Sequence, residues 1–304
     1  METSLGLKID VCTYDGLRVG VPNLLRLLDR HGVRGSFFVA LGPDASGRAI
    51  LRAFRPGFLV KMRRTSAIRT YGLRTILSGT LLPPRQMSRL APTLREVVVA
   101  GHELAIHGYN HRRWQDRLHR MGKQAVRQEI DRAMAVYHDV TGQVPRGFGA
   151  PGWQVSAASL EVLDEVGFAY ASDTRGLQPF FPRAAGRKFQ TLQLPTTFQT
   201  LDEVLGPDDP DGQTFVSDVR QEIKGRKWSV LTIHAEMEGI GFQGVTEQLL
   251  VMLRGDGVTC LPLEALGAQI RAQGEKEIPV TDVVARPIRG RTGTVAMPAG
   301  LEAG

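Results

Sequence analysis

The stretch HELAIHGYNH, residues 102 to 111, holds three of the chain's seven histidines: His102, His107 and His111. Its first half has the pattern of a short buried strand, and its second half is a turn that opens into polar sequence. Imidazole is the most common protein ligand for transition metals. The stretch therefore indicates either a metal site at the end of a strand or a polar helix start that carries surface histidines.

Outward from this stretch, short apolar runs alternate with helical patterns. The apolar runs are residues 7–11, 36–40, 103–107, 168–172, 191–195, 229–234 and 258–262. The helical patterns are residues 21–32, 123–142, 156–167 and 246–257. Repeated alternation of strands and helices predicts a mainly parallel sheet covered by helices.

Three of the predicted strands end in side chains that can bind a metal or transfer protons. The first strand ends near Asp10, Cys12 and Asp15, another reaches His107, and a third closes on His234. The carboxyl ends of parallel strands share one edge of a sheet, which is where α/β enzymes keep their active sites. We therefore expect these residues to lie together.

The composition is that of a soluble globular protein. Of 304 residues, 42% are hydrophobic and 23% are charged, and the mean hydropathy is −0.13. The two cysteines, Cys12 and Cys260, provide no disulfide framework, which fits a reducing compartment. We see no export signal and no apolar run of the roughly 18 to 20 residues that a membrane-spanning helix needs. We therefore expect a cytoplasmic protein.

The positive charge of the chain is concentrated in one segment. Residues 45–95 contain eleven lysines and arginines and no acidic residue, so this segment has a charge of +11. The net charge of the whole chain is +7, so the remaining residues together carry −4. Apolar residues are interleaved with the basic ones, which favours an insertion of short amphipathic helices on an anionic membrane surface. A solvated charged surface is the alternative. Nucleic-acid binding is not expected, because its motifs are absent.

Four motifs, in this order, resemble those of the polysaccharide deacetylase (NodB-homology, carbohydrate esterase 4) family. They are IDV at 9–11, H-x-x-x-H at 107–111, F-x-A-P-G-W at 148–153 and TIH at 232–234. The resemblance spans roughly residues 5 to 265 and implies a distorted (β/α)7 barrel. We expect a catalytic domain over residues 1–272, with the insertion 45–95 inside it. A tail, residues 273–304, is expected to wrap the surface or fray.

Within this family the chain resembles the deformylases of 4-deoxy-4-formamido-L-arabinose-phosphoundecaprenol. The similar segments are GVPNLLRLLDRHGV at 20–33, YASDTRG at 170–176 and TIHAEMEG at 232–239. The resemblance implies a substrate linked to undecaprenyl phosphate, whose freed amine is used to modify lipid A and so gives resistance to cationic peptides. It also implies peripheral association with the inner face of the inner membrane. The alternatives are another carbohydrate N-deacetylase and a non-catalytic membrane-binding barrel.

Carried over to this chain, the family pattern makes His107 and His111 ligands of one divalent ion, with zinc expected and other transition metals as alternatives. It makes Asp10 the general base and His234 the general acid. Amide hydrolysis needs these parts: a polarised carbonyl, an activated water and a proton for the departing amine. The chain departs from the family at the third ligand, where the acidic residue is missing, so that Cys12, Asp10 and Asp15 all stay open.

A second departure is Gly149, which stands where many relatives carry an arginine that orients the base. The residues we expect to contact the substrate are Trp153, Asp173, Arg175, Glu236 and Glu238. Each also has a structural alternative: a core position for the tryptophan, an ion pair for Asp173 and Arg175, and exposure to water for the two glutamates.

Overall fold

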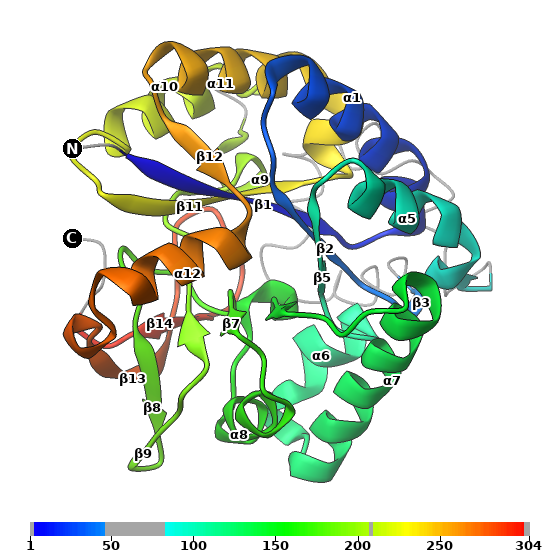
Figure 1. The fold of residues 1–304 in the computed structure, drawn as a ribbon, viewed down its shortest axis with the longest axis vertical. Coiled ribbons are helices and arrows are strands. Elements are labelled where there is room, and N and C mark those ends of the chain that lie inside the picture. Colours follow the sequence, from blue (N-terminus) through cyan, green and yellow to red (C-terminus); the bar gives the residue numbers. More distant parts are fainter. Residues whose placement is uncertain (1–2, 46–82, 207–208, 301–304) are drawn as a thin grey trace.

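The computed structural model describes residues 3–45, 83–206 and 209–300, which form a curled parallel sheet with helices packed around it (Figure 1). Within these residues the main sheet has eight strands, seven of them in the order β10-β7-β6-β5-β2-β1-β11, and β12 pairs with β1. Their bounds are β1 (Ser4–Val11), β2 (Ser36–Val39), β5 (Glu103–Ile106), β6 (Gly147–Phe148), β7 (Tyr170–Ala171), β10 (Leu192–Gln193), β11 (Trp228–His234) and β12 (Thr259–Leu261). The predicted distorted (β/α)7 barrel is confirmed.

Strand β1 is the centre of this sheet. It pairs with β11 along its length, from Ser4 opposite Trp228 to Asp10 opposite His234. Its other edge is divided, because β12 pairs with the first residues of β1 and β2 pairs with the last. All seven predicted strands are present, and the sequence patterns missed only β6 among the strands of the main sheet.

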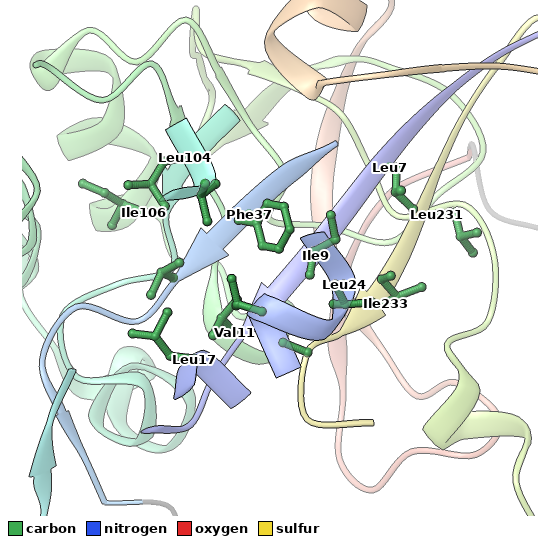
Figure 2. Close-up of a cluster of buried hydrophobic side chains, with 14 of the residues drawn as sticks. Leu7, Ile9, Val11, Leu17, Leu24, Phe37, Leu104, Ile106, Leu231 and Ile233 are labelled. Atoms are coloured by element: carbon green, nitrogen blue, oxygen red, sulfur yellow. The ribbon is translucent and has the colours of Figure 1, made fainter. Parts of the chain in front are cut away.

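Six helices pack on one face of the sheet around a large apolar core. They are α1 (Val21–His31), α5 (Ala91–Val99), α7 (Lys123–Thr141), α8 (Ala157–Val166), α10 (Gln213–Glu222) and α11 (Gln243–Gly255). Alternate β1 residues Leu7, Ile9 and Val11 point into this core, beside Leu24 of α1 and Ile233 of β11 (Figure 2). Successive strand residues point to opposite faces, so the residues between them lie on the concave face.

The concave face is covered by α12 (Leu263–Gly274). Its Leu263 and Leu266 belong to an apolar cluster with Phe38 of β2 and Val230 of β11. Gly6 of β1 allows this close packing, since a Cβ there would lie 2.8 Å from Cδ2 of Leu266. Lys8 and Asp10 therefore lie on the enclosed side of the sheet, farther along the same strand.

The predicted helix boundaries follow from proline and glycine. Helix α1 has Pro22 in its first turn, where a missing N–H costs nothing, and ends at Gly32 with a left-handed φ of 65°. Helix α7 ends in the same way at Gly142, with a φ of 69°. The shorter helices are α6 (His111–Arg117), η4 (Leu118–Arg120), η5 (Pro151–Trp153), α9 (Leu201–Val204) and η7 (Glu275–Glu277).

A second sheet lies beside the first and includes the C-terminal part of the chain. Its order is β14-β13-β8-β9, with bounds β8 (Phe181–Ala184), β9 (Arg187–Lys188), β13 (Val280–Arg286) and β14 (Val295–Pro298). Val295 and Met297 of β14 are buried against Trp153. Much of the segment expected to wrap the surface or fray is thus strand, while the division at residue 272 stays a prediction.

The predicted basic insertion falls mostly on residues 46–82, which lie outside the described residues. Of its described residues, β4 (Arg85–Gln86) pairs with β3 (Pro43–Asp44), η3 (Met87–Leu90) follows, and residues 91–95 already belong to the core helix α5. None of the helices in the three described ranges is both long and apolar enough to cross a membrane.

Two wide helical turns follow the two central strands and pack against each other. They are η1 (Gly16–Gly20), after β1, and η6 (Met237–Gly241), after β11. A Cβ on Gly20 would lie 2.0 Å from the backbone oxygen of Ala235, and one on Gly239 would lie 2.7 Å from the oxygen of Gly20. Only glycine permits this approach, which ties the end of β1 to the end of β11.

Replacing Gly20 with alanine should destabilise the protein, because a backbone oxygen cannot turn away from the added methyl as a side chain could. We expect Gly20→Ala to lower the free energy of unfolding by about 2 kcal/mol, within the usual range for overpacking. Denaturant unfolding measures this. The control is Gly244→Ala on α11, where an added Cβ meets nothing within 4 Å. Equal stability of Gly20→Ala and the parent would refute the interlocking of the two turns.

Candidate metal centre and catalytic site

The ends of five neighbouring strands bring the predicted site residues to one edge of the sheet. Val11, Val39, Ile106 and Phe148 are in register across β1, β2, β5 and β6. The next residue after β1 is therefore Cys12, and the next after β5 is His107. On the other side of β1, Asp10 is paired in register with His234 of β11. The expected convergence follows directly from the parallel register.

Cys12, His107 and His111 form a cluster that could hold a metal ion. Each offers one ligand atom, and these atoms all lie within 4.8 Å of one another. His111 is the first residue of α6, whose start is fixed by Asn110, since its side-chain oxygen accepts a hydrogen bond from the backbone N–H of Arg113 at 2.9 Å. The helix cap thus sets the position of the second imidazole relative to the first.

His107 is oriented by a backbone carbonyl. Its Nδ1–H donates to the oxygen of Gly149 at 2.8 Å, and its Nε2 lies 3.9 Å from Oδ2 of Asp10. Burial lowers the pKa of His107 to about 4. A neutral ring whose other nitrogen is held by a carbonyl is the usual arrangement of a metal-binding histidine.

The loop that carries Cys12 is held by a buried carboxylate. Oε1 of Glu236 accepts the backbone N–H groups of Cys12 at 2.7 Å and of Thr13 at 2.6 Å. Burial, with the nearby carboxylate of Glu236, raises the pKa of the Cys12 thiol well above its usual value. A thiol in this position keeps its proton unless a bound cation displaces it.

Asp15, a second open candidate for the third ligand, points to a different partner. Its two oxygens accept from the guanidinium of Arg85 at 3.0 and 2.9 Å, and Arg18 approaches it at 3.2 Å. Arg85 also lies 3.8 Å from Asp44, whose carboxylate accepts a hydrogen bond from the backbone N–H of Tyr14. Asp15 thus fastens the loop after β1 to the base of the insertion, at β4.

Asp10 is buried between two basic groups. Its Oδ2 lies 3.4 Å from Nζ of Lys8 and 3.9 Å from Nε2 of His107, and its Oδ1 has no hydrogen-bond partner within the described ranges. Burial alone would raise the pKa of Asp10, but the positive charge of Lys8, assisted by His107 and His234, outweighs burial and lowers it. Asp10 is therefore ionised at neutral pH and able to accept a proton.

His234 lies at the rim of the same edge. Its backbone N–H donates to Oε2 of Glu238 at 2.9 Å, and its Nδ1 lies 3.9 Å from Oδ1 of Asp202. Asp202 comes from α9 and accepts from the hydroxyl of Thr200 at 2.7 Å. Burial raises the pKa of Glu238 to about 7. His234 is thus positioned by two acidic residues, one behind its backbone and one beside its ring.

The residues expected to contact the substrate are all engaged with the protein itself. Trp153 is buried, donates from Nε1 to the hydroxyl of Thr196 at 3.0 Å and has an unusual positive φ of 52°. Nη1 of Arg175 donates to both carboxylate oxygens of Glu203, and the guanidinium lies 4.9 Å from the Trp153 ring. These contacts match the structural alternatives, and a role in substrate binding stays a prediction.

Asp173 is held in a similar way. Its Oδ1 accepts the N–H of Ala150 at 2.8 Å, and Gln193 donates to its Oδ2 at 3.3 Å. Burial raises the pKa of Asp173 to about 7. Glu236 is occupied by the Cys12 loop, whereas Oε1 of Glu238 has no hydrogen-bond partner within the described ranges. Among the five residues predicted to contact the substrate, Glu238 thus has a carboxylate oxygen without a hydrogen-bond partner in the described part of the chain.

Sequence patterns missed two residues of this site. Lys8 is fully buried and two residues before Asp10, so it shares the concave face with it. A lysine inside an apolar strand was the available signal. Asp202 lies in a four-residue helix far from every motif, and the sequence around it carries no signal of its approach to His234.

Comparison with known proteins identifies relatives of this chain. The family model for polysaccharide deacetylase matches residues 4–171. A probable 4-deoxy-4-formamido-L-arabinose-phosphoundecaprenol deformylase of Shewanella sediminis is 33% identical, over 98% of this chain and 96% of its own length. A protein of the same description from Wigglesworthia glossinidia brevipalpis is 29% identical, over 92% of this chain and 97% of its own.

Solved structures show the same fold. A Mycobacterium smegmatis protein described as a polysaccharide deacetylase superposes with a TM-score of 0.64 at 20% identity, covering 94% of both chains. A structure from Pseudomonas aeruginosa with the same description gives a TM-score of 0.63 at 16% identity, covering 90% of this chain and 92% of its own. The motifs, the fold and these relatives lead to one conclusion: the chain belongs to the polysaccharide deacetylase family and is a hydrolase that acts on an amide bond.

Proposed function

We propose that this protein is a metal-dependent deformylase that hydrolyses the formamide of 4-deoxy-4-formamido-L-arabinose-phosphoundecaprenol, releasing formate and the free amine. The observation that carries the proposal is the convergence of Cys12, His107 and His111 beside Asp10 and His234. Two relatives that match nearly the whole chain are described as probable deformylases of this lipid, which supports the choice of substrate.

The donor set fits a divalent ion, with zinc as its most suitable occupant. His107 offers Nε2 because its Nδ1 is committed to a carbonyl, and His111 and Cys12 complete three protein ligands. Two imidazoles and a thiolate favour zinc over magnesium or manganese, which prefer oxygen ligands. A divalent ion bound here would polarise the formyl carbonyl and increase the acidity of water.

The chain's own residues supply the proton transfers. Asp10 is ionised, and its unpartnered Oδ1 is able to accept a proton from the attacking water. His234 donates a proton to the departing amine, and Asp202 lies beside its ring. We propose that Oε1 of Glu238, which is buried and has no hydrogen-bond partner within the described ranges, accepts a hydrogen bond from the amino sugar. This division of roles needs a base and an acid on two adjacent strands, which β1 and β11 provide.

The location of the reaction is proposed from the substrate and from charge. A lipid-linked sugar requires the enzyme to work at a membrane, and the sequence of residues 45–95 carries +11 with interleaved apolar residues. We propose that this segment binds the anionic inner face of the inner membrane. Freed aminoarabinose lipid would then serve the modification of lipid A and resistance to cationic peptides.

Purified protein loaded with zinc and given the formamido-arabinose lipid should release formate, detected by a formate dehydrogenase assay. Asp10→Asn and His234→Ala should each lower kcat by about 10²- to 10⁴-fold, the range expected for a lost general base or acid. An N-acetyl analogue of the same lipid is the control substrate. Release of acetate from the analogue without release of formate from the formamide would assign the chain to another N-deacetylase activity.

Metal content should depend on Cys12. We expect zinc to be bound at about one ion per chain by the parent and by Asp15→Asn, and to be largely lost from Cys12→Ser, because a hydroxyl is a poor ligand for this ion. Elemental analysis after gel filtration measures this, and Cys260→Ser is the matched control. Loss of zinc from Asp15→Asn but not from Cys12→Ser would transfer the third ligand to Asp15.

Membrane binding should depend on the basic segment. Reversing Arg63, Arg64 and Arg69 to glutamate should weaken binding to anionic vesicles by more than about 10²-fold, since losing three basic residues removes about 3 kcal/mol and the three glutamates add repulsion. Binding of the parent should also fall as salt rises. The same charge reversal at exposed Arg183, Arg187 and Lys188 is the control for net charge. Equal binding of the first triple variant and the parent would refute this role.

A further inference from the structure

Lys8 is a charged residue enclosed within the barrel. It lies in the middle of β1 with none of its surface exposed, on the concave face that it shares with Asp10. Lysine is almost never fully buried without a partner, because removing an ammonium group from water is costly. Apolar packing alone therefore does not explain why a lysine is buried at this position.

The ammonium group has two polar contacts and two aromatic ones. Nζ lies 3.4 Å from Oδ2 of Asp10 and donates to the backbone oxygen of Ser172 at 3.2 Å. It also lies 5.1 Å from the ring centre of Phe38 and 5.7 Å from that of Trp153. The amine is thus held from several sides by β2, η5 and the residue that follows β7, and its reach toward Asp10 is fixed.

Gly149 leaves the space that Lys8 and Phe38 occupy. A Cβ at Gly149 would lie 2.6 Å from Cδ1 of Phe38 and 3.4 Å from Cε of Lys8. Any side chain there would push the Phe38 ring against the lysine chain. The same glycine supplies the carbonyl that orients His107, so the position of Lys8 and that of the imidazole are coupled through one residue.

We infer that Lys8 is the positioning residue of Asp10, holding one carboxylate oxygen so that the other faces the attacking water. Lys8 engages Oδ2, while Oδ1 has no hydrogen-bond partner within the described ranges. Without the ammonium group, the carboxylate could turn about its Cβ–Cγ bond and present neither oxygen correctly. The inference rests on the proposed role of Asp10 as the base, but Lys8 itself touches no reacting atom.

The first test replaces the ammonium group by an uncharged amide. Lys8→Gln keeps hydrogen-bond donors in the barrel and is expected to fold. A displaced base costs about 10²-fold in rate, so kcat should fall by that factor with KM unchanged. Lys8→Arg, which keeps the charge, should stay within about tenfold of the parent. The control is Lys188→Gln on β9, an exposed lysine that should leave kcat unchanged.

The second test restores the missing group chemically. Lys8→Ala lacks three methylenes and an amine, which n-propylamine supplies. Millimolar n-propylamine should recover a substantial part of kcat in Lys8→Ala, whereas 1-propanol of the same length should not. A merely structural role would give no such dependence on the charge. Equal rescue by both compounds, or kcat of Lys8→Gln within twofold of the parent, would overturn the inference.

A crystal structure of Lys8→Gln tests the inference without any substrate. We expect the Asp10 carboxylate to have turned, so that Oδ2 is no longer near Nε2 of His107. An unmoved carboxylate would overturn the positioning role whatever the rate. Turnover is measured on whichever amide the parent hydrolyses, the formamido lipid or its N-acetyl analogue. Failure of the proposed substrate therefore remains distinct from failure of the role of Lys8.

Discussion

The parallel pairing of β1 with β11 is the constraint on which the rest of the site depends. Its register sets Asp10 opposite His234, so the proposed base and acid start from adjacent strands. The turns after these strands are then locked together, since Gly20 packs directly against the backbone of Ala235. A shift of one residue in this pairing would turn every side chain of one strand to the other face, and the two catalytic candidates would separate.

Burial and neighbouring charges set the protonation states of the groups at this edge of the sheet. Glu236 is buried, and its Oε1 accepts a hydrogen bond from the backbone N–H of Cys12. His107 is kept neutral by burial, while Asp10 is kept charged by the cation beside it. One enclosed edge of the sheet thus holds a neutral imidazole and an ionised carboxylate within 4 Å of each other.

Much of the sheet and of the candidate site could be predicted from the sequence, because apolar periodicity marks the strands and the site residues follow directly at strand ends. The strands that carry Asp10, His107 and His234 were visible as apolar runs, and a parallel sheet brings their ends together. Lys8 and Asp202 were missed for opposite reasons: one stands inside a strand where a charge is unexpected, and the other approaches His234 from a distant short helix. The pairing of Asp15 with Arg85 spans 70 positions and leaves no local trace.

The C-terminal strands were also missed, because β13 has no fully buried residue and so no clear apolar alternation, and β14 has only four residues. Their contact with Trp153 is a tertiary effect that only the assembled barrel creates. The same holds for the left-handed backbone of that tryptophan, which its surroundings must impose. Local sequence specifies the elements here, whereas the second sheet and the strained residue are consequences of packing.

In the proposed function, the strand ends build a metal site from one thiolate and two imidazoles. X-ray absorption at the zinc edge of the loaded protein tests it most directly. We expect one sulfur ligand at about 2.3 Å and two imidazole nitrogens at about 2.0 to 2.1 Å. A shell made only of nitrogen and oxygen ligands would contradict it, because Cys12 would then have no part in holding the ion.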